Sequence, residues 1–118
     1  MGPRDEWLKD WFVGVNTGRE RAVSRDLLRI FLDFWELEGL NQKSTSTRQR
    51  YSGGLHALGG HLVARCTEED EIEQTALDLL LEAVGLDEGP LIFQDNELWQ
   101  RELDSTCRRV HRYLKRTG

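Results

Sequence analysis

The sequence predicts an all-α fold in which the whole chain, residues 1–118, forms a single helical domain. Three observations lead to this class. Apolar residues recur at intervals of three and four in four separate segments, which is the spacing of a buried helix face. Capping residues and glycines bound these segments, and the connections between them are short, as in a helical bundle. The length suits one domain with one modest core, and 38% hydrophobic residues exclude a disordered chain.

Two helices are predicted at the start of the chain. Trp7 and Trp11 lie four residues apart, as on one helical turn, so a short helix is expected within residues 5–15. A long helix is expected over about residues 18–38. A capping box and a terminal glycine bound it, at Thr17, Glu20 and Gly39. Its apolar stripe is Val23, Leu27, Ile30, Phe31, Phe34 and Leu37.

The next helix is predicted over about residues 46–65 and contains two glycine pairs. Each glycine inside a helix costs about 0.5–1 kcal/mol relative to alanine, so four of them need a reason. Either the helix bends or breaks there, or another backbone packs very close to it. Close packing inside the domain is the favoured interpretation, and an interface with another chain is the alternative. These candidate packing or interface residues are Gly53, Gly54, Gly59 and Gly60.

Two further helices are expected in the second half of the chain. One is predicted over about residues 68–84, with Thr67 as its N-cap and acidic residues in its first turn, where the helix dipole favours them. A loop over residues 86–94 separates it from the last helix, predicted over about 96–116. The expected buried stripe of that last helix is Leu98, Trp99, Leu103, Val110, Tyr113 and Leu114.

The formal net charge of -5 conceals four blocks of different sign. Residues 1–38 carry six bases and eight acids, and residues 39–67 carry four bases and no acid. Residues 68–104 carry thirteen acids and one base, whereas residues 105–118 carry five bases and no acid. An acidic total argues against a nucleic-acid partner, but this asymmetry keeps that partner open. It also suggests that oppositely charged faces pair between helices or between subunits.

The basic block has three residues at the start of the second long helix. Lys43, Arg48 and Arg50 lie where backbone N–H groups and the helix dipole also attract an anion, so together they can hold a phosphate. They are the candidate nucleic-acid-binding residues. The alternative is a solvated face that balances the acidic block, and it is the favoured interpretation for an acidic protein with few clustered bases.

No catalytic, metal or cofactor site is predicted. Cys66 and Cys107 make no disulfide framework, and the sequence has neither a Cys-x-x-Cys nor a His-Glu-x-x-His motif. A small enzyme with one of these thiols as nucleophile is the third hypothesis, although no general base can be assigned to Cys66. Neither a signal peptide nor a membrane-spanning run is visible, so a reducing cytoplasm is expected.

One stretch resembles a known family. Phe31-x-x-Phe34, Glu38-Gly39-Leu40, Thr47-Arg48-Gln49-Arg50-Tyr51 and Leu55-x-x-Leu58 are similar to the core-binding, SAM-like N-terminal domain of tyrosine recombinases. The resemblance covers about a quarter of the chain, residues 31–62, and implies a small helical bundle whose basic helix faces DNA. The recombinase catalytic domain has no counterpart here. The same stretch resembles small bacterial helical proteins of unknown function that share a Leu-Gly-Gly element.

These observations favour a non-enzymatic cytoplasmic interaction module that self-associates. Aromatic residues are enriched in interfaces and glycine permits close approach, so 4 Trp and two glycine pairs support this hypothesis. Filling of the core explains the tryptophans equally well. The expected partner is therefore a protein or a second copy of the chain, without a membrane. The alternative function is a nucleic-acid-binding accessory domain that uses the basic start of the second long helix.

Overall fold

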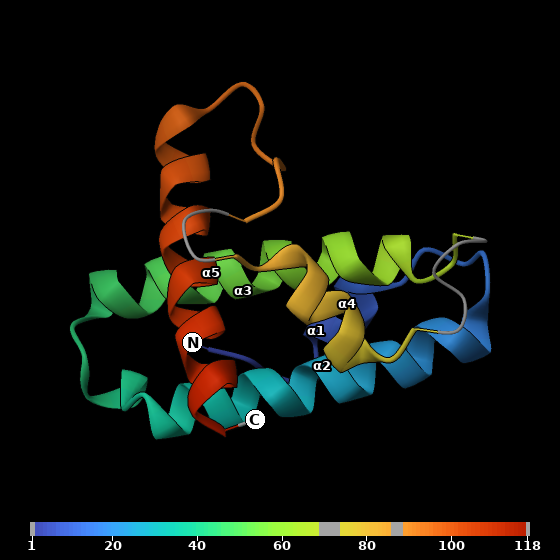
Figure 1. Cartoon of the computed structure of the whole chain (residues 1–118), viewed down its shortest axis with the longest axis horizontal. Helices are drawn as coiled ribbons and strands as arrows, with labels where there is room; N and C mark the ends of the chain where they lie inside the picture. The colour runs from blue at the N-terminus through green and yellow to red at the C-terminus, as the bar shows by residue number, and fades with distance from the viewer. Residues whose placement is uncertain (1, 69–73, 86–88, 118) are drawn as a thin grey trace.

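The computed structural model describes residues 2–68, 74–85 and 89–117, and it confirms the predicted all-α bundle (Figure 1). No residue in these ranges lies in a strand. The elements are α1 (Trp7–Trp11), α2 (Thr17–Leu37), the 3₁₀ turn η1 (Leu40–Gln42), α3 (Thr45–Arg65), α4 (Ala76–Ala83) and α5 (Glu97–Thr117). Three of the four predicted long helices therefore begin and end within a residue or so of their expected bounds.

Helices α2 and α3 run antiparallel and are joined through η1, and α5 runs steeply across both (Figure 1). Helix α1 packs against α2 and α3, and α4 packs against the same two helices from another side. The apolar stripe predicted for α2 packs against apolar residues of α3 in one continuous core, with the exception of Leu37, which is exposed. The fully buried residues at its centre include Leu27, Phe31, Phe34, Leu40, Leu55, Leu58 and Leu62.

The start of α2 differs from the predicted capping box. Asn16 is the N-cap, because its Oδ1 accepts a hydrogen bond from the backbone N–H of Arg19, and Thr17 is the first helical residue. Glu20 does reach back to the backbone N–H of the cap, Asn16, but it also extends further along the preceding turn. Its carboxylate accepts the backbone N–H groups of four consecutive residues, 13–16, at 2.6–3.1 Å. This buried acid therefore fixes the turn between α1 and α2.

The third long helix begins later than predicted. Helix α4 starts at Ala76 because Thr75 and Asp78 form a reciprocal capping box there. Thr67 is not a helix N-cap, since its hydroxyl donates to the carbonyl of Ala64 in the turn after α3. Residues 69–73 of the predicted helix, and 86–88 of the predicted loop, lie outside the described residues.

Helix α3 continues without a break through its four glycines. A Cβ added at Gly54 would overlap Thr106 of α5, and one added at Gly59 would overlap the indole of Trp11. Gly60 also lies beside Trp11, whereas Gly53 has nothing within 4 Å of the position where a Cβ would lie. Three of the four glycines thus face close neighbours within the same chain, and the fourth faces open space.

The first two turns of α5 are not buried as predicted. Leu98 is 61% exposed and Trp99 is 55% exposed, because this part of α5 extends beyond α3 (Figure 1). The loop and these turns, residues 89–102, form a projection that we call the arm. The buried stripe of α5 begins at Leu103 and continues through Val110 to Leu114.

Candidate interaction surfaces

The arm is held together by hydrogen bonds centred on Gln100 of α5. Its Oε1 accepts the backbone N–H groups of Ile92 and Phe93 at 3.1 and 2.9 Å. Its Nε2 donates to the carbonyl of Pro90 at 2.9 Å and to Asp104 Oδ1 at 3.0 Å. One side chain thus satisfies three loop backbone groups, so the loop has a defined path although no other helix covers it.

The surface of the arm is apolar and mainly acidic, and Arg101 is an exposed base on it. Trp99 packs edge-to-face on Phe93, with ring centroids 5.6 Å apart, and more than half of its surface faces solvent. Asp95 and Glu97 are exposed beside it. The exposed apolar side chains of the arm are Leu91, Leu98 and Trp99. Three large apolar side chains exposed on one projecting segment make the arm a candidate binding surface.

A groove of about 250 Å³ separates the arm from the start of α3. Arg50, one of the candidate nucleic-acid-binding residues, lines this groove opposite Trp99, together with Gly53. The remaining lining residues are Gln49, Gly54, Phe93, Glu102 and Leu103. Arg50 therefore faces the arm.

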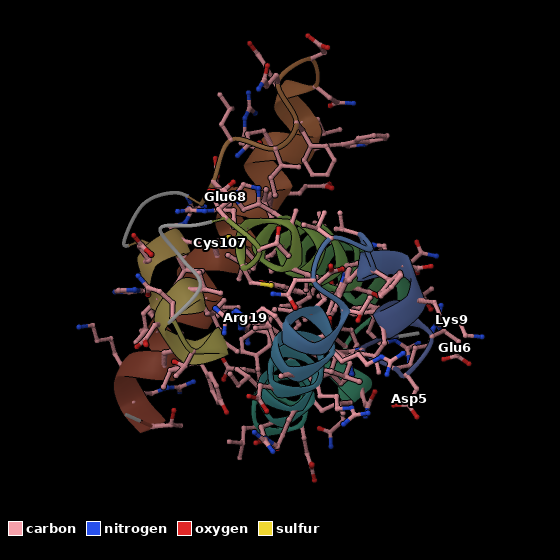
Figure 2. The ribbon with its side chains drawn as sticks, turned by 90° about the vertical axis from the view of Figure 1, so that its right-hand side faces the viewer. Asp5, Glu6, Lys9, Arg19, Glu68 and Cys107 are labelled. Atoms are coloured by element: carbon pink, nitrogen blue, oxygen red, sulfur yellow. The ribbon has the colours of Figure 1, made fainter. Side chains whose placement is uncertain are left out.

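A second hollow, of about 420 Å³, lies between α1 and the start of α2, and we call it the N-terminal pocket. Its apolar lining residues are Leu8 and Phe12. Three exposed bases line it as well, namely Lys9, Arg21 and Arg25. Figure 2 shows Lys9 pointing outward from α1. The other lining residues are Glu20 and Ser24.

Glu20 contributes a carboxylate whose hydrogen-bonding capacity is largely used within the chain. Burial would raise the pKa of Glu20, but the four backbone hydrogen bonds outweigh that effect and hold the pKa below its usual value. The carboxyl group is therefore ionised at neutral pH and balanced by the peptide dipoles that surround it. The net charge of the pocket remains positive.

A third hollow, also about 420 Å³, is lined by Glu38, Arg109, Arg112 and Arg116, and we call it the arginine cleft. Arg109 Nε donates to Glu38 Oε1 at 3.2 Å, and Arg116 Nη2 donates to Glu38 Oε2 at 2.7 Å. Arg109 Nη1 also donates to the Tyr51 hydroxyl at 3.2 Å. The side chain of Glu38 is only 11% exposed, so it orients two guanidinium groups from inside the cleft.

The pKa values in the cleft follow from these contacts. Burial alone would raise the pKa of Glu38, but its bonds to Arg116 and Arg109 lower it overall. Burial alone would lower the pKa of Arg109, but the Tyr51 hydroxyl and Glu38 raise it. Glu38 and Arg109 are thus both ionised at neutral pH. Because arginine keeps its positive charge in proteins, the cleft contains three positive charges and one negative charge.

The three basic residues predicted from sequence do not form one site. Lys43 is exposed at the end of η1, and Arg50 faces the arm. Arg48 is half-buried, and within the described residues its buried Nε has no hydrogen-bond acceptor. Arg48 and Arg50 are two positions apart, which places their side chains on different faces of α3.

Sequence reasoning identified the C-terminal bases as a charged block but missed the cleft that three of them form. Arg109, Arg112 and Arg116 are spaced by three and four, which places them on one helix face. This spacing was enough to predict from the sequence that the three arginines share one face of the last helix. Their pairing with Glu38, more than 70 residues earlier in the chain, left no local signature.

Both thiols are free and fully buried. Burial raises the pKa of Cys107 to about 12, and nearby Asp104 adds to the effect. Burial also raises the pKa of Cys66, whose Sγ donates to the carbonyl of Val63 at 3.0 Å. Each thiol is therefore protonated at neutral pH, a state in which cysteine is a poor nucleophile.

No family model, curated protein or solved structure matches this chain. The resemblance of residues 31–62 to the recombinase domain stays a prediction. Among the described residues, no helix has the length and apolar character needed to cross a membrane, and no cluster of three or more His, Cys, Asp or Glu is arranged for a metal ion.

Proposed function

We propose that this protein is a non-enzymatic interaction module that self-associates by placing the arm of one copy in the N-terminal pocket of another. The observation that carries the proposal is the exposure of Trp99 and Leu98 on a projection that is otherwise well ordered by hydrogen bonds. Tryptophan is among the residues that contribute most to protein interfaces. Free, buried thiols are usual in a reducing compartment, which supports a cytoplasmic location.

Charge complementarity favours a second copy as the partner. The arm presents Asp95 and Glu97 beside its apolar side chains. The N-terminal pocket presents its bases, among them Arg21 and Arg25, around Phe12. An apolar centre with oppositely charged rims is the arrangement that gives a contact both affinity and orientation.

The two surfaces are different, so the contact is heterologous. Each chain carries one arm and one pocket. Two copies can form a closed pair with two such contacts if a twofold rotation brings both into register, and otherwise they form open chains. Association is therefore expected to grow with concentration.

Light scattering coupled to size exclusion tests self-association directly. We expect Trp99→Ala to shift the wild-type oligomer to monomer. Leu37→Ala is the matched control, because Leu37 is 67% exposed but lies at the end of α2, away from the arm. A wild-type chain that remains monomeric at high micromolar concentration would contradict self-association.

A charge-exchange experiment tests which surfaces meet. One variant carries Asp95→Lys and Glu97→Lys in the arm, and the other carries Arg21→Glu and Arg25→Glu in the pocket. Each variant alone should be monomeric because like charges then face each other. Their mixture should associate again, since both the altered and the native pairs are complementary. If the mixture stays monomeric while the wild type associates, the arm does not use this pocket.

Nucleic-acid binding is the second candidate function. It is supported by the contact of Arg109 with Tyr51, which brings the basic end of α5 against the basic start of α3. Phosphate contacts would make binding strongly salt-dependent. Fluorescence anisotropy with duplex and single-stranded DNA at low salt tests it. Binding that is absent, or unchanged by Lys43→Glu, Arg48→Glu and Arg50→Glu, would exclude these residues as the site.

A further inference from the structure

We propose that the arginine cleft is a binding site for a dianionic phosphate group, such as a phosphate monoester. This site is independent of the arm and of the N-terminal pocket. It also uses none of the three bases that the sequence singled out. Four features of the cleft carry the proposal: its donors, its charge, the orientation of its guanidinium groups and its size.

The cleft has free donors. Arg112 lines it and makes no hydrogen bond or ion pair within the described part of the chain, so its guanidinium group can donate to a ligand. Arg116 commits one Nη2 contact to Glu38 and is otherwise exposed. A planar guanidinium group matches the spacing of phosphate oxygens and often binds them through two parallel hydrogen bonds.

Glu38 fixes the orientation of the guanidinium groups, although its negative charge lowers the net positive charge of the cleft by one unit. It accepts from both Arg109 and Arg116 and thereby holds their side chains in one orientation. The Tyr51 ring supports Arg109 from the other side, with the guanidinium carbon 5.3 Å from the ring centroid. A ligand therefore meets guanidinium groups that are already positioned, which lowers the entropy lost on binding.

The charge of the cleft favours a dianion. Three arginines and one glutamate leave a net charge of two positive units in a hollow of about 420 Å³. A phosphate monoester carries close to two negative charges at neutral pH. An internal phosphodiester carries only one, and a nucleic-acid strand needs a longer basic track than this hollow provides. The terminal phosphate of an oligonucleotide and a small phosphate compound present the same group.

Isothermal titration with inorganic phosphate at low ionic strength tests the site in the full chain. We expect saturable binding that Arg112→Gln and Arg116→Gln each weaken by at least about tenfold, because each substitution removes a charged hydrogen-bond donor to the phosphate. Arg101→Gln is the matched control, since Arg101 is an exposed arginine of the same helix outside the cleft. It should leave the affinity unchanged. Circular dichroism should show that all three variants keep the helix content of the wild type.

A second arm of the experiment separates the two sources of phosphate. The same oligonucleotide is titrated with a 5′ phosphate and with a 5′ hydroxyl. Tighter binding of the phosphorylated strand, lost in Arg112→Gln, assigns the site to a nucleic-acid end. Equal binding of both strands, with inorganic phosphate still bound in the cleft, assigns it to a small phosphate compound. No saturable phosphate binding, or an equal loss in Arg101→Gln, overturns the proposal. Because the arm variants leave the cleft intact, a failure here is distinct from a failure of self-association.

Discussion

Trp11 and Trp99 are the same residue type in two opposite environments. Trp11 is 2% exposed, its Nε1 donates to the carbonyl of His56 at 2.9 Å, and its ring packs edge-to-face on Phe31. Trp99 is 55% exposed and packs on Phe93 of a neighbouring loop. Helices surround the ring of Trp11, whereas Trp99 lies on the part of α5 that extends beyond the bundle. Burial is therefore decided by what lies opposite a residue, and helical spacing alone does not reveal that.

Removal of Trp11 should have the largest effect on stability. Trp11→Ala empties the space between α1 and α3 and removes the hydrogen bond from the indole to the carbonyl of His56. We expect a loss of about 4 kcal/mol in the free energy of unfolding, measured by urea denaturation. A loss below about 1 kcal/mol would mean that α1 does not belong to the cooperative core.

Glu20→Gln should have the next largest effect, because four backbone donors share this one carboxylate. An amide offers a single acceptor oxygen and turns its own N–H groups toward those donors. We expect a loss of about 3 kcal/mol in the free energy of unfolding. An acid of the arm provides the contrast, since Glu97→Gln at an exposed site should change stability by less than about 0.5 kcal/mol.

The pH dependence of stability provides a separate test of Glu20. Its pKa is lower in the folded chain than in the unfolded chain, so its contribution is fully present above the usual pKa of a glutamate. That contribution is lost as the pH falls through the lower, folded pKa. Unfolding curves from neutral to acidic pH should show this loss in the wild type and a smaller loss in Glu20→Gln. Equal acid sensitivity of the two proteins would show that other carboxyl groups dominate.

Two neighbouring glycines of α3 provide a second comparison between a buried and an exposed position of the same residue type. Gly54→Ala should destabilise the fold by about 2 kcal/mol, because a new methyl group would overlap Thr106. Gly53→Ala should stabilise it by about 0.5–1 kcal/mol, since its methyl group enters open space and alanine is the better helix former. Thermal unfolding of both variants measures the two changes in stability, which should be opposite in sign. A stabilised Gly54→Ala would mean that α5 can move away from α3 at little cost.

Trp99→Ala should have the smallest destabilising effect, about 1 kcal/mol or less, because more than half of its surface is already exposed. Urea denaturation at a concentration where the protein is monomeric measures it. The same variant is expected to abolish self-association, so the contrast with Trp11→Ala separates a structural residue from an interface residue. A large loss of monomer stability would instead make the arm a part of the core.

Much of the fold was accessible from the sequence because its signals are local. Apolar spacing and end signals located α2, α3 and α5, and Gly39 adopts the expected left-handed backbone with φ of +63°. The start of α4 was missed because an acidic segment after Thr67 has the composition of a first helical turn. The capping box of Thr75 and Asp78, eight residues further on, marks the true start.

The candidate surfaces were less accessible because they depend on contacts between distant segments. The sequence located the bases of α3 but could not show that Arg48 and Arg50 diverge around that helix. The sequence also placed Trp99 in a buried stripe, because the apolar spacing of the last helix continues into the turns that extend beyond the core. The arginine cleft needs Glu38 and Arg116 together, and only the tertiary fold joins them.

Glu38 also has a consequence for the order in which the chain can fold. It lies just after α2, at the end of that helix where the dipole is negative and an acid is unfavourable. Its two cationic partners, Arg109 and Arg116, are in the last helix of the chain. During synthesis from the N-terminus, the end of α2 carries uncompensated negative charge until α5 has emerged. The last turns of α5 therefore neutralise the negative end of α2, which ties the charge balance of this helix to the last part of the chain to be made.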